Sequence, residues 1–202
     1  MEDINWRFSD KFRSHWIKIK FYKDKPKLNG IKPARNIRFC EATNKALFEP
    51  ILINKKSMSC SGAQHAFGWR DGFKNELLKN CNSKRKTQNN ISKSMLSRAP
   101  YFKEPIEYIG LNTEGIPDMV LSYMPPQEVM DLVKIYHNRR GKNLDVSLCP
   151  MMSICGGIAV RTYLNEDISI SFGCNDSRQH ADIRRENLAV GIPRKLFEIF
   201  VD

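Results

Sequence analysis

The stretch "IPDMVLSYMPPQEVMDLVKIYHNRRG", residues 116–141, joins a short apolar run to an amphipathic one. The continuous apolar run of residues 116–124 predicts a buried strand. Four apolar residues then recur at helical spacing and predict one buried helix face: Val129, Leu132, Val133 and Tyr136. Gly141 predicts the C-terminal cap of this helix. A strand followed directly by an amphipathic helix indicates a domain in which helices pack on a sheet.

Similar strand and helix signals occur on both sides of this stretch. We expect further strands at 15–24, 50–57, 107–111 and 168–172. We expect further helices at 32–50, after a cap at Ser59, at 145–164 and at 193–202. Strands and helices mingle without a regular βαβ alternation. The sequence therefore predicts a single α+β domain over residues 1–202, with a mixed or antiparallel sheet and packed helices.

The composition is that of an ordinary globular protein. The chain has 202 residues, 41% of them hydrophobic and 27% charged, with a formal net charge of +11. No apolar run approaches the roughly 20 residues that cross a bilayer, and the N-terminal residues show no secretory signal, so we expect a cytoplasmic protein with no membrane association. Six cysteines in a reducing compartment are expected to be free, metal-bound or catalytic rather than paired in disulfides.

The positive charge is concentrated in one stretch. Residues 70–103 contain nine Lys or Arg and two acidic residues, which gives this span a charge of +7. We expect a solvated basic loop or insertion around 74–103, with Cys81 as an exposed bystander. Such a stretch can also attract an acidic protein or RNA. No aromatic residues interleave the basic run as they do in stacking platforms, which argues against nucleic acid.

Four cysteines share a local context of small residues. Cys60 precedes "SGA", Cys155 precedes "GGIA", and Cys174 follows Gly173. Cys40 and Cys60 fall near predicted helix starts, where N–H groups stabilise a thiolate. Thiolates with clearance and nearby N–H donors are what an iron–sulfur or other thiolate-ligated centre needs.

The spacing of the cysteines matches no common metal module. No C-x₂-C pair occurs, and Cys149 and Cys155 are separated by five residues. Any centre must therefore be assembled from distant segments, with Cys149 as a spare ligand or a redox thiol. The alternative is that each cysteine packs separately as a small hydrophobe.

The stretch "ISFGCNDSRQH", residues 170–180, delivers Cys174 at a glycine turn that ends a predicted strand. Arg178 follows four residues later. A guanidinium near a thiolate lowers the pKa of the thiol or binds an anionic substrate, so Cys174 and Arg178 are candidate catalytic residues. The alternative for Arg178 is a salt bridge to Asp176 or Glu186.

Several segments together resemble domain-of-unknown-function family 169, which occurs in archaea and anaerobic bacteria. The resemblance rests on "ARNIRFCEATNKAL", "CSGAQHAFGW", "PDMVLSYMPPQEVMDLV", "SICGGIAV", "ISFGCNDSRQHADI" and "LAVGIPRKLFEIF", and it extends from Ile17 onward. It implies no assigned activity. The four cysteines fall inside these recognisable segments, whereas the basic stretch after Phe73 is a departure from the family pattern.

We therefore expect a [4Fe–4S] protein with an electron-transfer or other redox role. Its cofactor ligands would be Cys40, Cys60, Cys155 and Cys174, and an acidic redox protein would be its partner. Zinc at the same cysteines is an alternative, because soft sulfur ligands suit both metals. The same residues are also compatible with a metal-free thiol or small-molecule-binding enzyme that uses Cys174 and Arg178, and the charge is compatible with a basic binding module. The sequence leaves the oligomeric state open.

Overall fold

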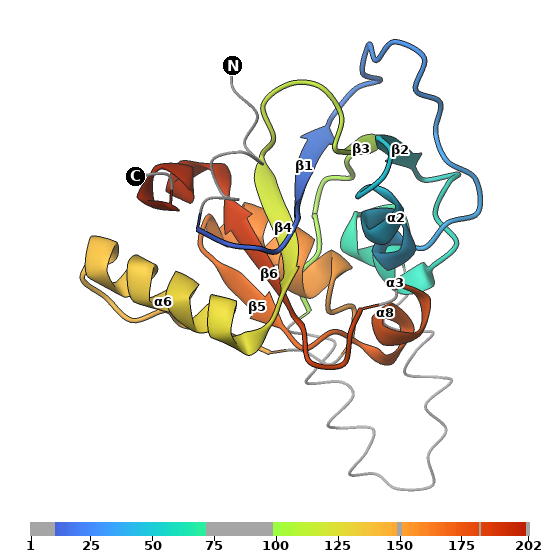
Figure 1. The fold of residues 1–202 in the computed structure, drawn as a ribbon. Helices are drawn as coiled ribbons and strands as arrows, with labels where there is room; N and C mark the ends of the chain where they lie inside the picture. Colours follow the sequence, from blue (N-terminus) through green and yellow to red (C-terminus); the bar gives the residue numbers. More distant parts are fainter. Residues whose placement is uncertain (1–10, 72–98, 149–150, 182, 201–202) are drawn as a thin grey trace, which may run out of the picture.

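The computed structural model describes residues 11–71, 99–148, 151–181 and 183–200. Its centre is a six-stranded sheet in the order β2-β3-β1-β4-β6-β5. The strands are β1 (Trp16–Tyr22), β2 (Ile51–Asn54), β3 (Tyr108–Leu111), β4 (Met119–Met124), β5 (Ser169–Ser171) and β6 (Leu188–Pro193). Every pair of neighbouring strands is antiparallel. Figure 1 shows helices on both sides of this sheet, which confirms the α+β class.

Strand β4 lies near the middle of the sheet and feeds both hydrophobic layers. Because side chains alternate along a strand, Met119 and Leu121 point to one layer, and Val120 and Met124 point to the other. The strand pairs with β1 through Ile19↔Met119 and with β6 along its whole length. The predicted buried strand is thus confirmed as a core element of the sheet.

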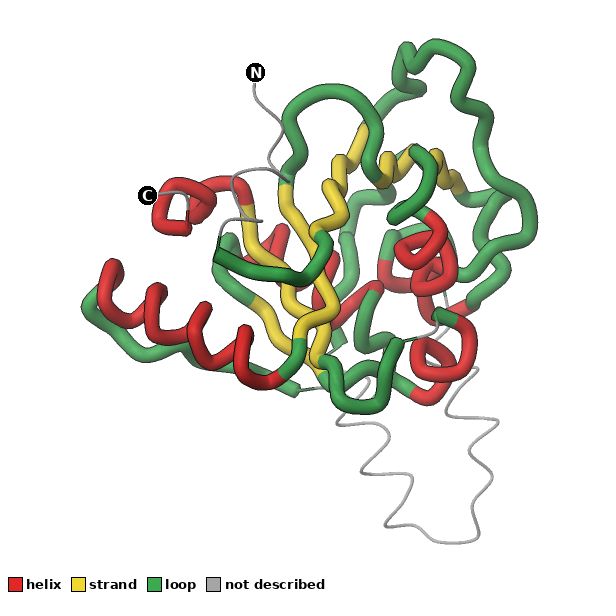
Figure 2. The backbone as a smooth tube through the Cα atoms, in the orientation of Figure 1, coloured by secondary structure: helices red, strands yellow, loops and turns green. Residues whose placement is uncertain are grey.

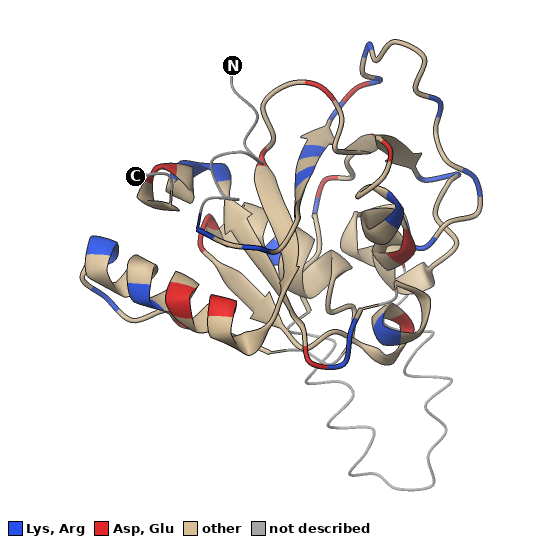
Figure 3. Ribbon diagram, in the orientation of Figure 1, with Lys and Arg blue, Asp and Glu red and all other residues tan. Residues whose placement is uncertain are grey.

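The first layer contains α6 (Pro126–Arg140) and the 3₁₀ helix η2 (Arg194–Phe200). The apolar face predicted for α6 packs here, with Val129, Leu132 and Tyr136 buried. Gly141 ends the helix with a φ of 63°, as a C-terminal glycine cap requires. The opposite side of α6 carries acidic and basic residues (Figure 3).

The second layer contains α2 (Phe39–Lys45), α3 (Ser61–Ala66), α7 (Arg161–Asn165), α8 (Asn175–His180) and the π-helix η1 (Cys155–Val160). Red helical segments gather on this side of the yellow strands in Figure 2. The layer packs tightly on β6, since a Cβ at Gly191 would stand 2.4 Å from Thr162 Oγ1 and 2.8 Å from Ile158 Cγ2. Glycine at this position therefore lets the η1–α7 segment approach the sheet.

Several elements differ from the sequence prediction. The helix predicted over 32–50 is limited to α2, and the one over 145–164 divides into η1 and α7. The N-cap of α3 is Cys60 rather than Ser59, and the C-terminal helix is 3₁₀. Strand β6 and helix α8 were not predicted.

Two further points bound the functional interpretation. Within the described ranges, no helix combines the length and apolarity that a bilayer crossing needs. Most of the basic stretch predicted at 74–103 lies outside the described residues, as do Cys81 and Cys149.

Candidate cysteine site

A cavity of about 410 Å³ lies on the second layer, where the ends of several helices meet. Its lining includes four cysteines from four separate segments of the chain: Cys40, Cys60, Cys155 and Cys174. We call this cavity and its lining the four-cysteine pocket. The structure therefore brings together the four thiols that the sequence singled out, although they are far apart along the chain.

Each cysteine stands at the beginning of a helical element. Cys40 is in the first turn of α2, and Cys60 and Cys174 are the N-cap residues of α3 and α8. Cys155 is the first residue of η1. Figure 1 shows α2, α3 and α8 grouped beside one another on the same side of the sheet. The pocket is thus the meeting point of four helix starts.

The thiols differ in exposure and in charge behaviour. Cys40 and Cys155 are buried, whereas Cys60 and Cys174 are partly exposed. Burial raises the pKa of Cys40 to about 12, and the neighbouring Cys174 and Cys60 contribute to this rise. Burial also raises the pKa of Cys155, again with contributions from Cys60 and Cys174. The thiols are therefore close enough to influence one another, and several thiolates in this space repel each other.

Backbone N–H groups partly offset this cost. The N–H groups of Glu41 and of Cys40 itself lower the pKa of Cys40, and the N–H of Gly156 does so for Cys155. The sulfur of Cys174 accepts a hydrogen bond from the N–H of Ser177. Such donors stabilise sulfur atoms that carry negative charge.

Small and strained residues shape the wall of the pocket. A Cβ at Gly62 would lie 3.0 Å from Met152 Cγ and 3.8 Å from Cys60 Sγ, so glycine there keeps space beside the thiol. Met152 has a φ of 50°, which is rare for a residue with a side chain. Its carbonyl accepts the N–H groups of Gly156 and Gly157 at 2.8 and 2.9 Å, where η1 begins. Strained residues and π-helical turns are common at functional sites.

A buried hydroxyl pair connects the pocket to the centre of the sheet. Thr43 Oγ1 donates to the carbonyl of Cys40 at 2.7 Å and lies 2.7 Å from the hydroxyl of Tyr123. Because the Thr43 proton is used, Tyr123 donates to Thr43. Burial raises the pKa of Tyr123, and Cys40 and Cys174 add to the rise, which keeps the phenol neutral. Sequence reasoning missed this pair, since neither residue stands in a recognisable motif.

Arg178 holds the loops beside Cys174. Its guanidinium donates to the carbonyl of Phe172 through Nε at 2.8 Å, to that of Asn187 at 2.7 Å, and to that of Arg184. The Asn187 side chain in turn donates to the carbonyl of Tyr123 at 3.3 Å. Hydrogen bonds therefore link the Cys174 turn to β4. The proposed action of Arg178 on the Cys174 thiol stays a prediction.

Asp176 has a different partner from the one considered for it. Its carboxylate pairs with Arg38 at 2.7 Å, whereas the sequence suggested Arg178. Arg38 immediately precedes α2 and Asp176 lies in the first turn of α8, so the ion pair joins the helices that carry Cys40 and Cys174. This pair is largely exposed and contributes little to stability, but it crosses the edge of the pocket.

The thiols surround the cavity rather than converge on one point. Among the described residues, no three His, Cys, Asp or Glu side chains are placed to hold one metal ion. A single tetrahedral zinc, with Zn–S bonds of about 2.3 Å, draws its sulfurs to within about 4 Å of one another. In a [4Fe–4S] cluster each cysteine binds a different iron, so the sulfurs stand farther apart and enclose a volume. The donor set and the cavity therefore fit a polynuclear cluster better than one ion.

Comparison with known proteins gives a family but no activity. An uncharacterised protein of Methanocaldococcus jannaschii is 24% identical over 90 residues, which cover 45% of this chain and 39% of that relative. No solved structure matches this chain. The family model of DUF169, described as uncharacterised ArCR, matches residues 11–202. The chain therefore belongs to the DUF169 family.

Proposed function

We propose that the protein binds a [4Fe–4S] cluster in the four-cysteine pocket and serves in electron transfer or another redox process. The observation that carries this proposal is the lining of one cavity of about 410 Å³ by four cysteines from four distant segments. Independent packing of thiols as small hydrophobes gives no reason for this convergence.

The electrostatics of the metal-free thiols support the same proposal. Burial and mutual repulsion disfavour thiolates at Cys40 and Cys155. A cation in the cavity removes both penalties, because its positive charge stabilises thiolate ligands. A bound cluster would supply a one-electron redox couple. The chain's own contribution would be to hold four thiolates, to donate N–H groups to sulfur and to limit the access of water.

The exposure of the ligands suggests where electrons would enter and leave. Cys60 and Cys174 are partly exposed, whereas the other two cysteines are buried. We propose that a redox partner approaches on the side of Cys60 and Cys174. The net charge of +11 favours an acidic partner protein, and a reducing cytoplasm would keep the thiols available for iron.

Anaerobic purification with analysis of iron, zinc and acid-labile sulfide tests the metal centre. We expect a brown protein with about four irons and four sulfides per chain and with broad visible absorption. Cys40→Ser and Cys155→Ser should each lower the iron content strongly, whereas Cys81→Ser, in the basic stretch, should leave it unchanged. Zinc in place of iron, or equal iron in all three variants, would refute the proposal.

A metal-free thiol enzyme is the second candidate, and the position of Cys174 favours it. This thiol is partly exposed, lines the pocket and accepts the N–H of Ser177. Alkylation of metal-free protein at neutral pH, followed by peptide mapping, tests it. Modification of Cys174 well before Cys81 supports an activated nucleophile. Equal rates at the two thiols would remove this candidate.

A further inference from the structure

A second cavity, of about 610 Å³, lies at the opposite end of the η1–α7 segment from the four-cysteine pocket. Its lining comes from the start of β4, the end of α7, and the junction of β6 with η2: Asp118, Tyr163, Leu164, Glu166, Pro193, Arg194, Lys195 and Glu198. We call it the charged cleft. None of these residues belongs to the four-cysteine pocket, so the charged cleft is a separate site.

Asp118 is the fixed acidic group of the charged cleft. Its Oδ2 accepts the N–H of Phe21 at 2.8 Å, beyond the last residue pair between β1 and β4. The carboxylate is partly buried, and burial raises its pKa although Phe21, Lys20 and Arg194 act to lower it. A partly desolvated carboxylate with a raised pKa gains from a cationic ligand that replaces the lost water.

Charged groups of both signs remain available around Asp118. Lys195 and Glu166 satisfy each other at 2.7 Å. By contrast, the side chains of Arg194 and Glu198 form no hydrogen bond or ion pair with any other described residue, and both are exposed. Figure 3 shows basic and acidic residues side by side along η2. The charged cleft therefore offers the guanidinium of Arg194 and the carboxylates of Asp118 and Glu198 to a ligand.

The remaining wall is apolar and rigid. Tyr163 is 39% exposed and Leu164 is 50% exposed, which is unusual for such large side chains. The Tyr163 ring is held edge-on by Phe21 and Phe102, with centroid distances of 5.0 and 5.4 Å. A fixed aromatic ring next to groups of opposite charge gives a ligand both an apolar contact and an orientation.

We propose that the charged cleft binds a small zwitterion of the α-amino-acid type. The ammonium group contacts the carboxylate of Asp118, the ligand carboxylate contacts the guanidinium of Arg194, and the ligand side chain rests on Tyr163 and Leu164. The volume lies within the range of small-molecule sites, roughly 300–1,000 Å³. Two oppositely charged contacts select a zwitterion over ligands that carry one charge only.

Titration of the full chain with the common L-α-amino acids, followed by calorimetry and NMR, tests this proposal. We expect at least one to bind. Its N-acetyl derivative, which lacks the ammonium group, and its amide, which lacks the carboxylate, should each bind at least about tenfold more weakly. Absence of binding by every amino acid at millimolar concentration, or equal binding of the blocked derivatives, would overturn the proposal.

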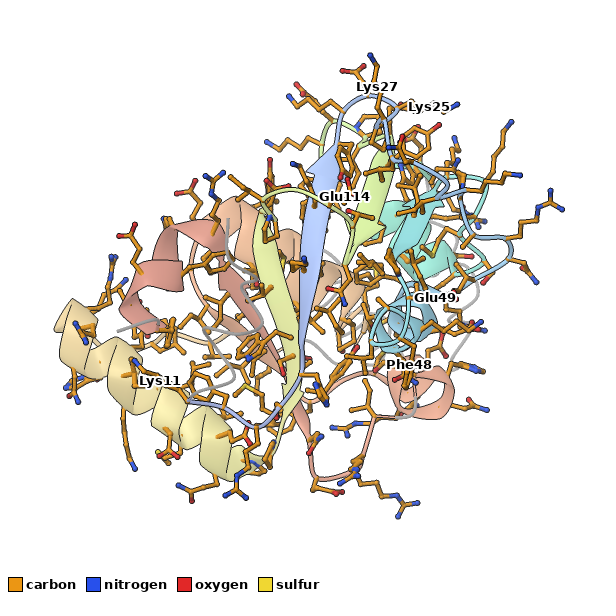
Figure 4. All side chains as sticks on the ribbon, turned by 45° about the horizontal axis from the view of Figure 1, so that its top comes forward. Lys11, Lys25, Lys27, Phe48, Glu49 and Glu114 are labelled. Carbon is orange, nitrogen blue, oxygen red and sulfur yellow. The ribbon has the colours of Figure 1, made fainter. Side chains whose placement is uncertain are left out.

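Two variants locate the ligand. Asp118→Asn keeps an oxygen that accepts the Phe21 N–H, so the fold is retained while the charge is lost, and thermal melting checks this. Asp118→Asn and Arg194→Gln should each weaken binding about tenfold or more. Lys25→Gln and Glu49→Gln, at exposed positions labelled away from the charged cleft in Figure 4, are the matched controls. Equal affinity in all four variants would place the ligand elsewhere. This test needs no metal, so it is independent of the cluster proposal.

Discussion

The thiol of Cys40 shows how a single residue reports on the state of the whole site. Its pKa of about 12 means that the metal-free protein holds it as a neutral thiol at physiological pH. Ligation requires the opposite state, a thiolate. Metal binding at the four-cysteine pocket must therefore release a proton from this residue, and the affinity for metal is expected to rise with pH.

The metal-free protein should lose stability in alkaline solution because of Cys40. The unfolded thiol titrates near 9 and the folded one near 12, so the unfolded state loses its proton first as the pH rises. The stability present below pH 9 should therefore decline through this window, by up to about 4 kcal/mol at one pKa unit per 1.36 kcal/mol. Urea unfolding at several pH values measures this decline. Cys40→Ala should make it shallower, and an unchanged slope in that variant would contradict the assignment.

The Thr43–Tyr123 hydroxyl pair predicts an order of stability. Thr43→Val leaves the Tyr123 hydroxyl without its acceptor and removes a donor from the Cys40 carbonyl, which should cost about 1–3 kcal/mol. Tyr123→Phe keeps the bond from Thr43 to Cys40 and should cost about 1 kcal/mol. Denaturant unfolding of both variants checks the order. A larger loss in Tyr123→Phe would show that the phenol, rather than Thr43, holds the segment.

Arg178 can be tested as a clamp on the loops beside Cys174. Lysine cannot reproduce donation to three separate carbonyls, so Arg178→Lys should destabilise the protein by about 1–3 kcal/mol. Arg185→Lys, at an exposed position nearby, is the control and should change stability by less than about 0.5 kcal/mol. Equal stability of the two variants would leave Arg178 available for the Cys174 thiol instead.

The sequence identified the chemical groups of the four-cysteine pocket more fully than their surroundings. Small neighbours and predicted helix starts marked Cys60 and Cys174, because those features act over a few residues. The Thr43–Tyr123 pair and the engagement of Arg178 by carbonyls depend on segments many residues apart. No local pattern encodes such contacts, so they required the structure.

At the scale of elements, the four-cysteine pocket depends on where short helices begin. Gly173 has a φ of 83°, and a Cβ there would lie 2.8 Å from Ser177 Oγ. That hydroxyl accepts the N–H of Cys174 at 2.8 Å and donates to its carbonyl, which closes the first turn of α8. The glycine therefore fixes the direction in which β5 leads into Cys174.

Substitution of two glycines separates conformational strain from crowding. Gly141→Ala meets no atom within 4 Å, so only its positive φ is penalised, by roughly 1–2 kcal/mol. Gly173→Ala adds a clash with the Ser177 hydroxyl and should destabilise the protein more, with a larger drop in the melting temperature. Gly173→Ala should also lower the iron content, whereas Gly141→Ala should not. Equal melting temperatures would show that the turn at Gly173 relaxes without cost.

Elements with a strong local pattern were predicted well, and elements defined by tertiary contact were not. The helix α6 has a long amphipathic run and a glycine cap, so its face and its end were both foreseen. The segment of α8 has six residues and no apolar stripe, so its pairing with α2 through Arg38 and Asp176 is visible only in space. Strand β6 contains Gly191 and Pro193, residues that usually argue against a strand, and Gly191 is needed for the approach of the η1–α7 segment.

At the scale of the whole molecule, the sheet separates two jobs. One layer, with α6 and η2, buries an ordinary amphipathic face. The other layer is built of short helices, a π-helix and glycines, a construction that gives less continuous packing but brings four chain segments to one point. We infer that stability comes mainly from the sheet and the first layer, and that the second layer is organised around the four-cysteine pocket.

Iron and acid-labile sulfide in anaerobically purified protein, measured beside a variant with Cys40, Cys60, Cys155 and Cys174 all changed to Ser, test the central claim most directly. The account predicts about four irons and four sulfides per chain in the native protein and almost none in the variant. A native protein that contains no iron, or a variant that retains the native amount, would contradict it.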